Sequence, residues 1–265
     1  MKQSLFDIVI IGAGVIGHSI AFRLKQCRPD LNLAVLGDPM NSLMASRAAA
    51  GMLAPFGECS EADRFFRFCR ESLLQYPDFI KDLISTSDIP VHLSMKGSLI
   101  PSSSLGNDWE KRIRFFREEN IPHEIWSPAR CQQLAPALAE SCGEVMWVGE
   151  GQVNNREMHD ALVAASRKLG VEILEKNVTG FIHDSSIVEA AVTSTLEVRS
   201  QKFILASGSW SSQLGDALDV SLPLKPIKGQ MCRVQVEDDQ LDYTVHGLMT
   251  YIAPWRGGKG FVLGT

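Results

Sequence analysis

The chain has 265 residues, of which 45% are hydrophobic and 22% charged, a composition that fits a globular protein with one large domain or two modest ones. Its net charge of -5 offers no broad basic surface to nucleic acid, no apolar run approaches the ~20 residues of a membrane span, and the apolar N-terminal stretch is too short for a signal peptide. The six cysteines are scattered without a C-x-x-C pair, so we expect neither disulfides nor a metal site, and a cytoplasmic location is predicted.

The first predicted elements are a strand over residues 8–11 and a helix over 16–26, joined by a G-x-G-x-x-G turn. The four branched apolar residues suit a strand that is buried on both faces of a parallel sheet. Gly12 would allow the tight turn, Gly14 the close approach of a pyrophosphate, and Gly17 the close packing of helix on strand. The free N–H groups and the dipole at the helix N-terminus favour the same negative charge. The pattern therefore predicts a dinucleotide site, with a purely structural turn as the alternative; its residues are Gly12, Ala13, Gly14, Val15, Ile16 and Gly17.

A second apolar strand is predicted over residues 33–36, and the dinucleotide fingerprint places after it an acidic residue that binds the ribose hydroxyls. Gly37 occupies that position, and Asp38 comes one place later. Two interpretations remain open. Either Asp38 reaches the ribose from a shifted backbone, or Asp38 and Pro39 form an ordinary turn and the hydrogen bond to the ribose is lost.

Residues 46–55 are mostly small, so their backbone could lie against a flat ligand or pack as a small-residue turn on the sheet. Apolar residues follow helical spacing over 61–83, and the aromatic stripe there, which includes Phe65 and Phe68, is expected to belong to the core. A strand is predicted over 91–101. Trp109, Ile113 and Phe116 mark a further helix.

Residues 156–169 predict an amphipathic helix that ends at Gly170, and residues 171–174 predict a further strand of a parallel sheet. Alternating strands extend to about residue 198. A buried-type strand at 203–206 runs into a second glycine turn at 207–211, which could also present backbone to a nucleotide. Residues 234–236 and 251–262 suit antiparallel strands.

The order of these elements predicts an α/β fold with two domains. A Rossmann-type domain for the cofactor, residues 1–85 and 143–220, is interrupted by a substrate domain with a mixed or antiparallel sheet, residues 86–142 and 221–265. One sheet built from separated pieces, with a second sheet inserted, suits a large flat cofactor that bridges two domains.

Taken together, four segments resemble the flavoprotein amine oxidase family that includes D-amino-acid oxidase and sarcosine oxidase, and within it the glycine oxidase of thiamine biosynthesis. They are the glycine turn at 12–17, the more specific run Ala-Ala-Ala-Gly-Met-Leu-Ala-Pro at 48–55, the second glycine turn at 205–211, and residues 226–231 with 251–254. The resemblance spans the whole chain. Two positions depart from the family pattern: Gly37 replaces an acidic residue, and Trp255 stands where an arginine commonly follows the proline, with Arg256 next to it.

The resemblance implies FAD, held non-covalently, and the oxidative deamination of a small amino acid or secondary amine of the glycine, sarcosine or D-alanine class. Hydride would pass to flavin N5, and oxygen would be reduced to peroxide. The implied partners are the amine substrate and oxygen, with a homo-oligomer as a further expectation and with neither nucleic acid nor membrane.

The resemblance also implies roles for individual residues. Ser46 and Arg47 would reach the pyrophosphate, Met52 would lie near the flavin ring, and Val178 would begin a strand that meets the adenine. Tyr251 matches the family tyrosine whose hydroxyl meets the substrate carboxylate. On the alternative interpretation Met52 packs in the core, Arg47 is a solvated charge, and Tyr251 is an ordinary strand residue. The remaining implied cofactor contacts are Ala49, Ala50, Gly51, Ala206, Ser207, Gly208 and Trp210.

Family members continue beyond the position of Thr265, with an arginine that clamps the substrate carboxylate and a glycine-rich segment under the flavin. We therefore expect the C-terminal part of the family fold to be missing here and the chain by itself to be a poor catalyst, with Arg256 as the first candidate for a substitute clamp. Two other functions remain open. One is a dehydrogenase of the same fold that passes electrons to a quinone or carrier, and the other is a chain that binds FAD without turnover.

Overall fold

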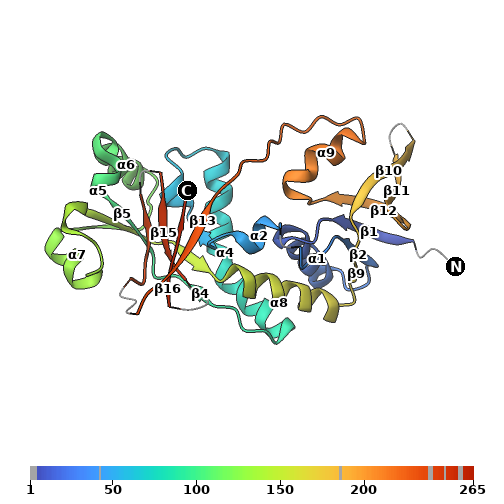
Figure 1. Cartoon of the computed structure of the whole chain (residues 1–265), viewed down its shortest axis with the longest axis horizontal. Helices are drawn as coiled ribbons and strands as arrows, with labels where there is room; N and C mark the ends of the chain where they lie inside the picture. The colour runs from blue at the N-terminus through green and yellow to red at the C-terminus, as the bar shows by residue number, and fades with distance from the viewer. Residues whose placement is uncertain (1–4, 42, 185–186, 238–240, 248, 256–258) are drawn as a thin grey trace. The chain divides into compact units, whose positions relative to one another are not determined.

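The computed structural model describes residues 5–41, 43–184, 187–237, 241–247, 249–255 and 259–265 (Figure 1). The chain forms two compact units, each built from three separated pieces. The first unit comprises Met1–Ala48, Leu83–Pro90 and Arg156–Lys228, and the second comprises Ala49–Asp82, Val91–Asn155 and Gly229–Thr265. These limits differ from the predicted domain limits chiefly at residues 49–82, which pack in the second unit.

The first unit alternates strands and helices in the order expected for an α/β domain. Its elements are β1 (Phe6–Ile11), α1 (Val15–Cys27), β2 (Leu33–Leu36), α2 (Ala45–Ala48), α8 (Asn155–Lys168), β9 (Glu172–Leu174), β10 (Val178–Asp184), β11 (Ile187–Thr193), β12 (Glu197–Leu205), the 3-10 turn η3 (Gly208–Trp210) and α9 (Ser211–Asp216).

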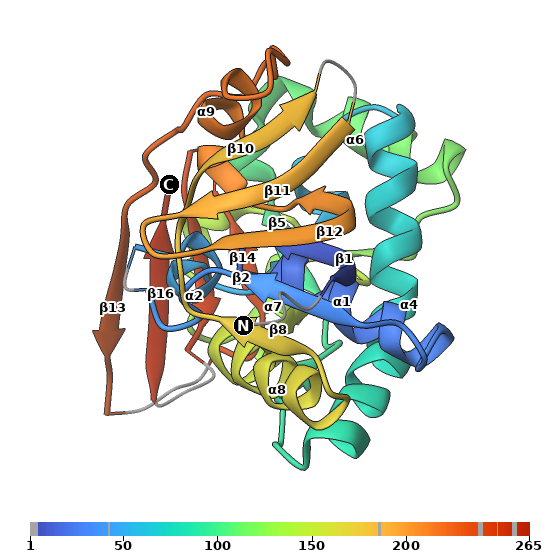
Figure 2. The same ribbon diagram turned by 90° about the vertical axis from the view of Figure 1, so that its right-hand side faces the viewer.

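These strands form one sheet with the order β10-β11-β12-β1-β2-β9 (Figure 2). Strands β12, β1, β2 and β9 are parallel, and β11 and β10 add an antiparallel edge. Both faces of β1 are buried, because Ile10 packs with Ala21 of α1 on one face while Ile11 packs with Leu214 of α9 on the other. The doubly buried parallel strand predicted from the branched residues 8–11 is therefore confirmed.

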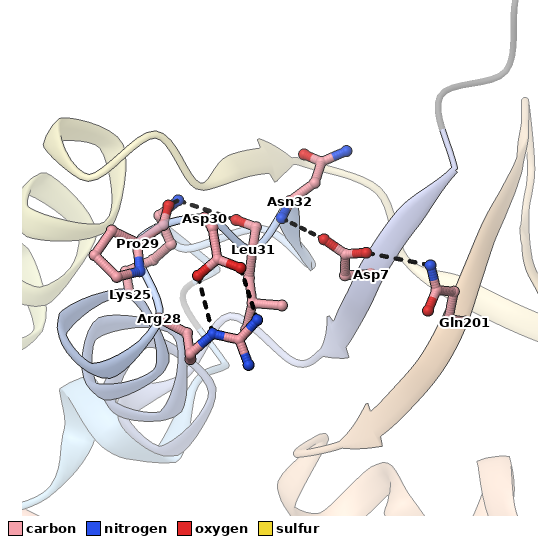
Figure 3. Close-up of polar contacts among 8 residues, drawn as sticks. All are labelled: Asp7, Lys25, Arg28, Pro29, Asp30, Leu31, Asn32 and Gln201. Atoms are coloured by element: carbon pink, nitrogen blue, oxygen red, sulfur yellow. Dashed lines mark hydrogen bonds and ion pairs between the residues drawn. The ribbon is translucent and has the colours of Figure 1, made fainter.

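A group of polar contacts fixes the amino end of this sheet (Figure 3). The Asp7 carboxylate accepts the Asn32 backbone N–H at 2.8 Å and the Gln201 side-chain amide at 3.2 Å, which ties β1 to the entry of β2 and to β12. Lys25 closes the turn after α1, since its Nζ donates to two carbonyl oxygens of that turn at 2.7 and 3.0 Å. All of these contacts lie at the amino end of the sheet, opposite the carboxyl ends of the parallel strands.

The second unit is richer in antiparallel structure. Its elements are β3 (Met52–Leu53), α3 (Pro55–Glu58), β4 (Leu93–Ser94), β5 (Ser98–Pro101), α5 (Ser102–Leu105), η1 (Gly106–Asp108), α6 (Trp109–Glu118), β6 (His123–Trp126), α7 (Pro128–Leu134), η2 (Glu140–Cys142), β7 (Val145–Val148), β8 (Gly151–Val153), β13 (Met231–Gln235), β14 (Thr244–His246), β15 (Tyr251–Pro254) and β16 (Gly260–Gly264).

A mixed sheet with the order β13-β16-β15-β14-β5-β7-β6 dominates this unit, beside a small sheet β3-β8-β4. Its neighbouring strands are antiparallel except for β14 and β5, which run parallel. The mixed sheet expected for the inserted domain is therefore confirmed. The strand predicted over 91–101 is interrupted at Gly97, whose φ of +104° breaks it into β4 and β5.

The long helix α4 (Arg64–Ser87) contributes residues to both units. In the second unit its Phe66 and Leu73 pack with Ile100 of β5. The expectation that Phe65 and Phe68 belong to the core is wrong, because their side chains are 65% and 73% exposed. Buried positions recur seven residues apart along this helix, which turns positions 65 and 68 to its outer face. No helix among the described residues combines the length and the apolar character needed to cross a membrane.

Candidate functional site

The glycine turn after β1 has the close packing that its sequence predicts. Gly12 has a φ of +123°, and a Cβ there would lie 2.2 Å from the carbonyl oxygen of Ala206 at the end of β12. A Cβ on Gly17 would lie 1.9 Å from the carbonyl oxygen of Gly12, so only glycine lets α1 approach the turn this closely. Gly12 also donates its N–H to the Leu36 carbonyl at 2.8 Å, which joins the ends of β1 and β2.

Gly14 differs from Gly12 and Gly17. A side chain at those two positions would collide with backbone, whereas the space beside Gly14 is open. A Cβ on Gly14 would approach only the Ser46 hydroxyl oxygen, at 3.2 Å. That oxygen accepts the Val15 N–H at 3.1 Å, so Ser46 covers one donor of the first turn of α1. The first turn carries no acidic residue, and the positive end of the helix dipole is therefore open to an anion.

A cavity of about 610 Å³ lies against this turn, within the first unit. Its walls come from the segments that follow β1, β2, β9 and β12, that is, from the carboxyl ends of all four parallel strands. Open α/β sheets bind ligands at this edge, next to the point where the strand order reverses. The volume falls in the range of small-molecule and cofactor sites, about 300–1,000 Å³.

Most of the cofactor residues predicted from the first unit line this cavity. They are Gly12, Ala13, Gly14, Ile16, Asp38, Ser46, Val178, Ala206, Ser207, Gly208 and Trp210. Val15 and Gly17 do not line the cavity. They shape the turn, because Val15 N–H donates to Ser46 and Gly17 lets α1 approach Gly12. The structure thus brings the two glycine turns, at residues 12–17 and 207–211, to one cavity.

The structure explains why an acidic residue is absent from position 37. Gly37 has a φ of +139°, and a Cβ there would lie 2.9 Å from the Ala13 nitrogen. Asp38 is exposed on the cavity wall, where its Oδ1 accepts the Met40 N–H at 2.8 Å. This contact forms the ordinary turn of one interpretation. Because Asp38 also lines the cavity, the ribose contact of the other interpretation stays a prediction.

Arg47 points to helix α8. Its Nη1 donates to Asp160 and lies 3.3 Å from Nδ1 of His159. Only 20% of the Arg47 side chain is exposed, so it is not a solvated surface charge. Its predicted contact with a pyrophosphate remains untested.

Several cavity residues escaped the sequence analysis, notably Asn41, Lys176, Thr179 and Gln213. Asn41 and Lys176 lie in loops, Thr179 lies in β10 and Gln213 in α9, and none of these positions carries a recognised sequence motif. The usable signal was positional, because each follows the carboxyl end of a strand of the parallel sheet. Asn41 follows β2, residues 176–179 follow β9, and Gln213 follows β12.

From Ala49 onward the small-residue run belongs to the second unit, where it is fixed to strand β8. Gly51 has a φ of +75°, and a Cβ there would lie 1.9 Å from the Val153 carbonyl oxygen. Met52 pairs with Gln152 in the small sheet, and the Gln152 side-chain amide donates to the carbonyls of Ala50 and Pro254 at 3.0 and 2.8 Å. Ala49 is exposed, whereas Ala50, Gly51 and Met52 are half-buried. Their predicted contact with FAD stays a prediction.

Tyr251 lies on β15 and extends across the neighbouring strand. It pairs with Gly264 of β16, and a Cβ on Gly264 would lie 2.3 Å from the tyrosine oxygen, so the glycine makes room for the ring. The hydroxyl donates to Met231 Sδ at 2.9 Å. Burial raises the pKa of Tyr251, and the charge of Glu58 raises it further, so the phenol remains a hydrogen-bond donor at neutral pH. Arg256, the candidate substitute clamp, lies outside the described residues.

The geometry of the first unit, with its glycine turn, helix N-terminus and cavity at one sheet edge, defines a dinucleotide-binding fold. The sequence family of FAD dependent oxidoreductases (DAO) matches residues 7–265, and the chain belongs to this family. The cofactor and the family inferred from the sequence are thereby confirmed.

The chain is similar to several characterised proteins. It is 29% identical to the bifunctional protein ThiO/ThiG of Synechocystis over 97% of this chain, and it spans 38% of the length of that relative. It is 27% identical to the glycine oxidase of Geobacillus kaustophilus, with 96% of this chain and 68% of that protein covered. The crystal structure of glycine oxidase from Geobacillus kaustophilus superposes on 98% of this chain and 71% of that chain with a TM-score of 0.89, at 26% identity.

The residues of the first unit fit the diphosphate-containing half of FAD. The evidence is the open position at Gly14, the unopposed N-terminus of α1, and the cavity into which both face. Backbone N–H groups at a helix N-terminus are suited to phosphate oxygens. The hydroxyls and amides of the cavity wall supply further donors.

Proposed function

We propose that this chain belongs to an FAD-dependent oxidase that deaminates a small amino acid or secondary amine of the glycine, sarcosine or D-alanine class. The observation that carries the proposal is the cavity at the carboxyl ends of the parallel strands, with Gly14 open at its wall, in a chain of this flavin-dependent family. Similarity to proteins named glycine oxidase supports the substrate class.

Bound FAD would supply the redox chemistry, by accepting a hydride equivalent from the carbon that bears the amine and by passing the electrons to oxygen to give peroxide. The protein's share is to bind and orient. The turn at 12–17 would hold the pyrophosphate through backbone N–H groups, while Asp38 would accept hydrogen bonds from the ribose hydroxyls.

In this proposal Tyr251 contacts the substrate. Its hydroxyl is half-buried, stays protonated at neutral pH and is bonded to the thioether of Met231, which is a weak acceptor. A substrate carboxylate would be a much stronger acceptor and would displace that sulfur contact. Tyr251 would thus fix the carboxylate end of the substrate, without acting as a base.

Two measurements test the proposal. The absorption spectrum of the purified chain should show flavin bands, and their absence after incubation with excess FAD would contradict the cofactor site. Turnover should be measured with glycine, sarcosine and D-alanine in the protein that contains this chain, with peroxide and dye reduction followed separately. Peroxide release in air supports an oxidase, whereas turnover with dye alone would indicate a dehydrogenase that uses a quinone or carrier. Flavin binding without turnover of any of the three amines would support the alternative function, a protein that binds FAD without catalysis.

The similarity to a ThiO/ThiG protein also supports a proposed place in thiamine biosynthesis, consistent with the resemblance found in the sequence. A cytoplasmic location is proposed on the same grounds as before, and the six cysteines are all free thiols in the structure. Growth of a deletion strain with and without thiamine would test the pathway.

A further inference from the structure

A buried histidine lies directly beneath the glycine turn. His159 of α8 is fully buried, and its Nε2 lies 2.8 Å from the carbonyl oxygen of Ala13, the residue between Gly12 and Gly14. Its other ring nitrogen, Nδ1, lies 3.3 Å from Nη1 of Arg47. The residue thus connects helix α8, which belongs to a distant part of the sequence, with the predicted phosphate-binding loop.

The two contacts define one tautomer of this ring. Arginine nitrogens can only donate hydrogen bonds, so Nδ1 of His159 must be the acceptor and carries no proton. The single proton of the neutral ring is then on Nε2, where it is needed for donation to the Ala13 carbonyl. Arg47 is itself held by the Asp160 carboxylate, so its guanidinium is fixed in this orientation.

The surroundings favour the neutral ring. Burial lowers the pKa of His159, and the positive charge of Arg47 lowers it further, while the bond to the Ala13 carbonyl and the Asp160 charge act in the opposite direction. The imidazole of His18, 5.8 Å away between ring centroids, is the other titratable ring in contact. A neutral ring agrees with the tautomer that the hydrogen bonds require.

We propose that His159 is a positioning residue for cofactor binding, which orients the Ala13–Gly14 peptide for the phosphate. In a trans peptide the carbonyl and the next N–H point in opposite directions. Fixing the Ala13 carbonyl toward His159 therefore directs the Gly14 N–H away from α8, toward the side on which Gly14 borders the cavity. The inference rests on the proposed function, because it assumes that the cavity binds the diphosphate of FAD.

The test compares three variants of the 265-residue chain. His159→Met places an apolar side chain of similar size at this position and removes the hydrogen-bond donor. His159→Gln retains an amide N–H that can reach the Ala13 carbonyl. Ser166→Ala is the matched control, because Ser166 lies on the same helix and bonds to buried His18 at 3.1 Å without touching the glycine turn. FAD and ADP affinities are measured by titration of the apoproteins, and thermal unfolding is measured without ligand.

We expect His159→Met to weaken FAD and ADP binding about tenfold, the cost of a misaligned hydrogen-bond donor, and His159→Gln to recover most of the loss. Ser166→Ala should lower the unfolding temperature but leave both affinities unchanged. If the wild-type chain binds FAD and His159→Met binds it equally well, the inference is wrong while the proposed function stands. If the wild-type chain binds neither FAD nor ADP, the proposed function fails and the inference fails with it.

A second measurement does not depend on a folded His159→Met protein. The ring nitrogens of His159 can be assigned by ¹⁵N NMR of the wild-type chain, with Arg47→Met as the comparison. The proposal requires a proton on Nε2 in the wild type, and retention of that proton in Arg47→Met, because the Ala13 carbonyl still needs a donor. A proton on Nδ1 in the wild type would overturn it.

Discussion

Gly37 lies against Ala13, so that a Cβ at position 37 would come within 2.9 Å of the Ala13 nitrogen and 3.1 Å of its Cβ. Position 37, where the dinucleotide fingerprint usually has the ribose-binding acidic residue, therefore lies against the predicted phosphate-binding loop in this chain. Its φ of +139° is a backbone conformation that residues with a side chain rarely adopt. The backbone at position 37 therefore suits glycine and would not accept an acidic side chain without a shift.

We expect Gly37→Ala to destabilise the protein by roughly 2–4 kcal/mol, from strain at this φ together with the contact on Ala13. Gly180→Ala is the matched control, because a Cβ at Gly180 in the same unit meets open space. Urea unfolding followed by circular dichroism measures both. Equal midpoints for the two variants would mean that the loop at 37 moves freely away from Ala13.

Asp38 is expected to take over the ribose contact. Asp38→Asn keeps an oxygen that can accept the Met40 N–H but removes the charge and one of the two acceptors, so the turn should survive. FAD affinity should fall roughly 10- to 150-fold, the loss of one hydrogen bond to a charged group, with the unfolding midpoint unchanged. An unaltered affinity in equilibrium titration would favour the interpretation in which residues 38 and 39 form a turn and nothing more.

Gly14 and Gly17 should separate ligand binding from folding. The Cβ of Gly14→Val meets only a serine hydroxyl, which can rotate away, so we expect the fold to be retained while the added side chain excludes the pyrophosphate. Gly17→Ala forces a methyl group onto the Gly12 backbone and should prevent stable folding. Flavin content and circular dichroism spectra of the two purified variants are the measurements, and full flavin retention in Gly14→Val would contradict the site.

His18 predicts an acid sensitivity of the first unit. Ser166 Oγ donates to the Leu162 carbonyl and therefore accepts from Nδ1 of His18, while Nε2 is buried without a hydrogen-bond partner among the described residues. Burial above all, and then electrostatic interaction with His159 and Arg167, lowers the pKa of His18 from 6.5 to about 3. The folded protein thus keeps this ring neutral at pH values where the unfolded chain protonates it.

Between pH 6.5 and 3 the unfolded state binds more protons at His18 than the folded state, so stability falls as the pH falls through this window. The loss approaches about 1.4 kcal/mol per pH unit from this residue. His18→Leu should flatten the pH dependence of urea unfolding between pH 7 and 4.5, and substitution of the exposed His183 by Leu should not. Parallel curves for wild type and His18→Leu would contradict the prediction.

The sequence was most informative where one residue type has a single physical use. Gly12 and Gly17 are required by backbone contacts shorter than any side chain allows, and the branched residues 8–11 suit only a doubly buried strand, so both were predictable. The exposure of Phe65 could not be predicted, because a helix with apolar residues on several faces does not indicate which face packs. The pairing of His159 with Ala13 joins residues 146 positions apart and has no local signal.

The role of Tyr251 is the most direct test of where the substrate lies. If its hydroxyl binds the substrate carboxylate, Tyr251→Phe removes one charge-assisted hydrogen bond, worth roughly 1.5–3 kcal/mol. Because the carboxylate is bound equally in the ground and transition states, KM should rise about tenfold or more with kcat little changed. Folding should be unaffected, since the ring stays above Gly264.

The control is Met231→Leu, which removes the sulfur that the hydroxyl contacts without removing the hydroxyl itself, and which should leave KM close to the wild-type value. Amine oxidation by the protein that contains this chain would be measured over a range of glycine, sarcosine and D-alanine concentrations. Burial raises the pKa of Tyr251, so the hydroxyl remains protonated and the KM difference between wild type and Tyr251→Phe should persist from neutral to mildly alkaline pH. Identical parameters for all three substrates would mean that Tyr251 is a structural strand residue and that the substrate carboxylate binds elsewhere.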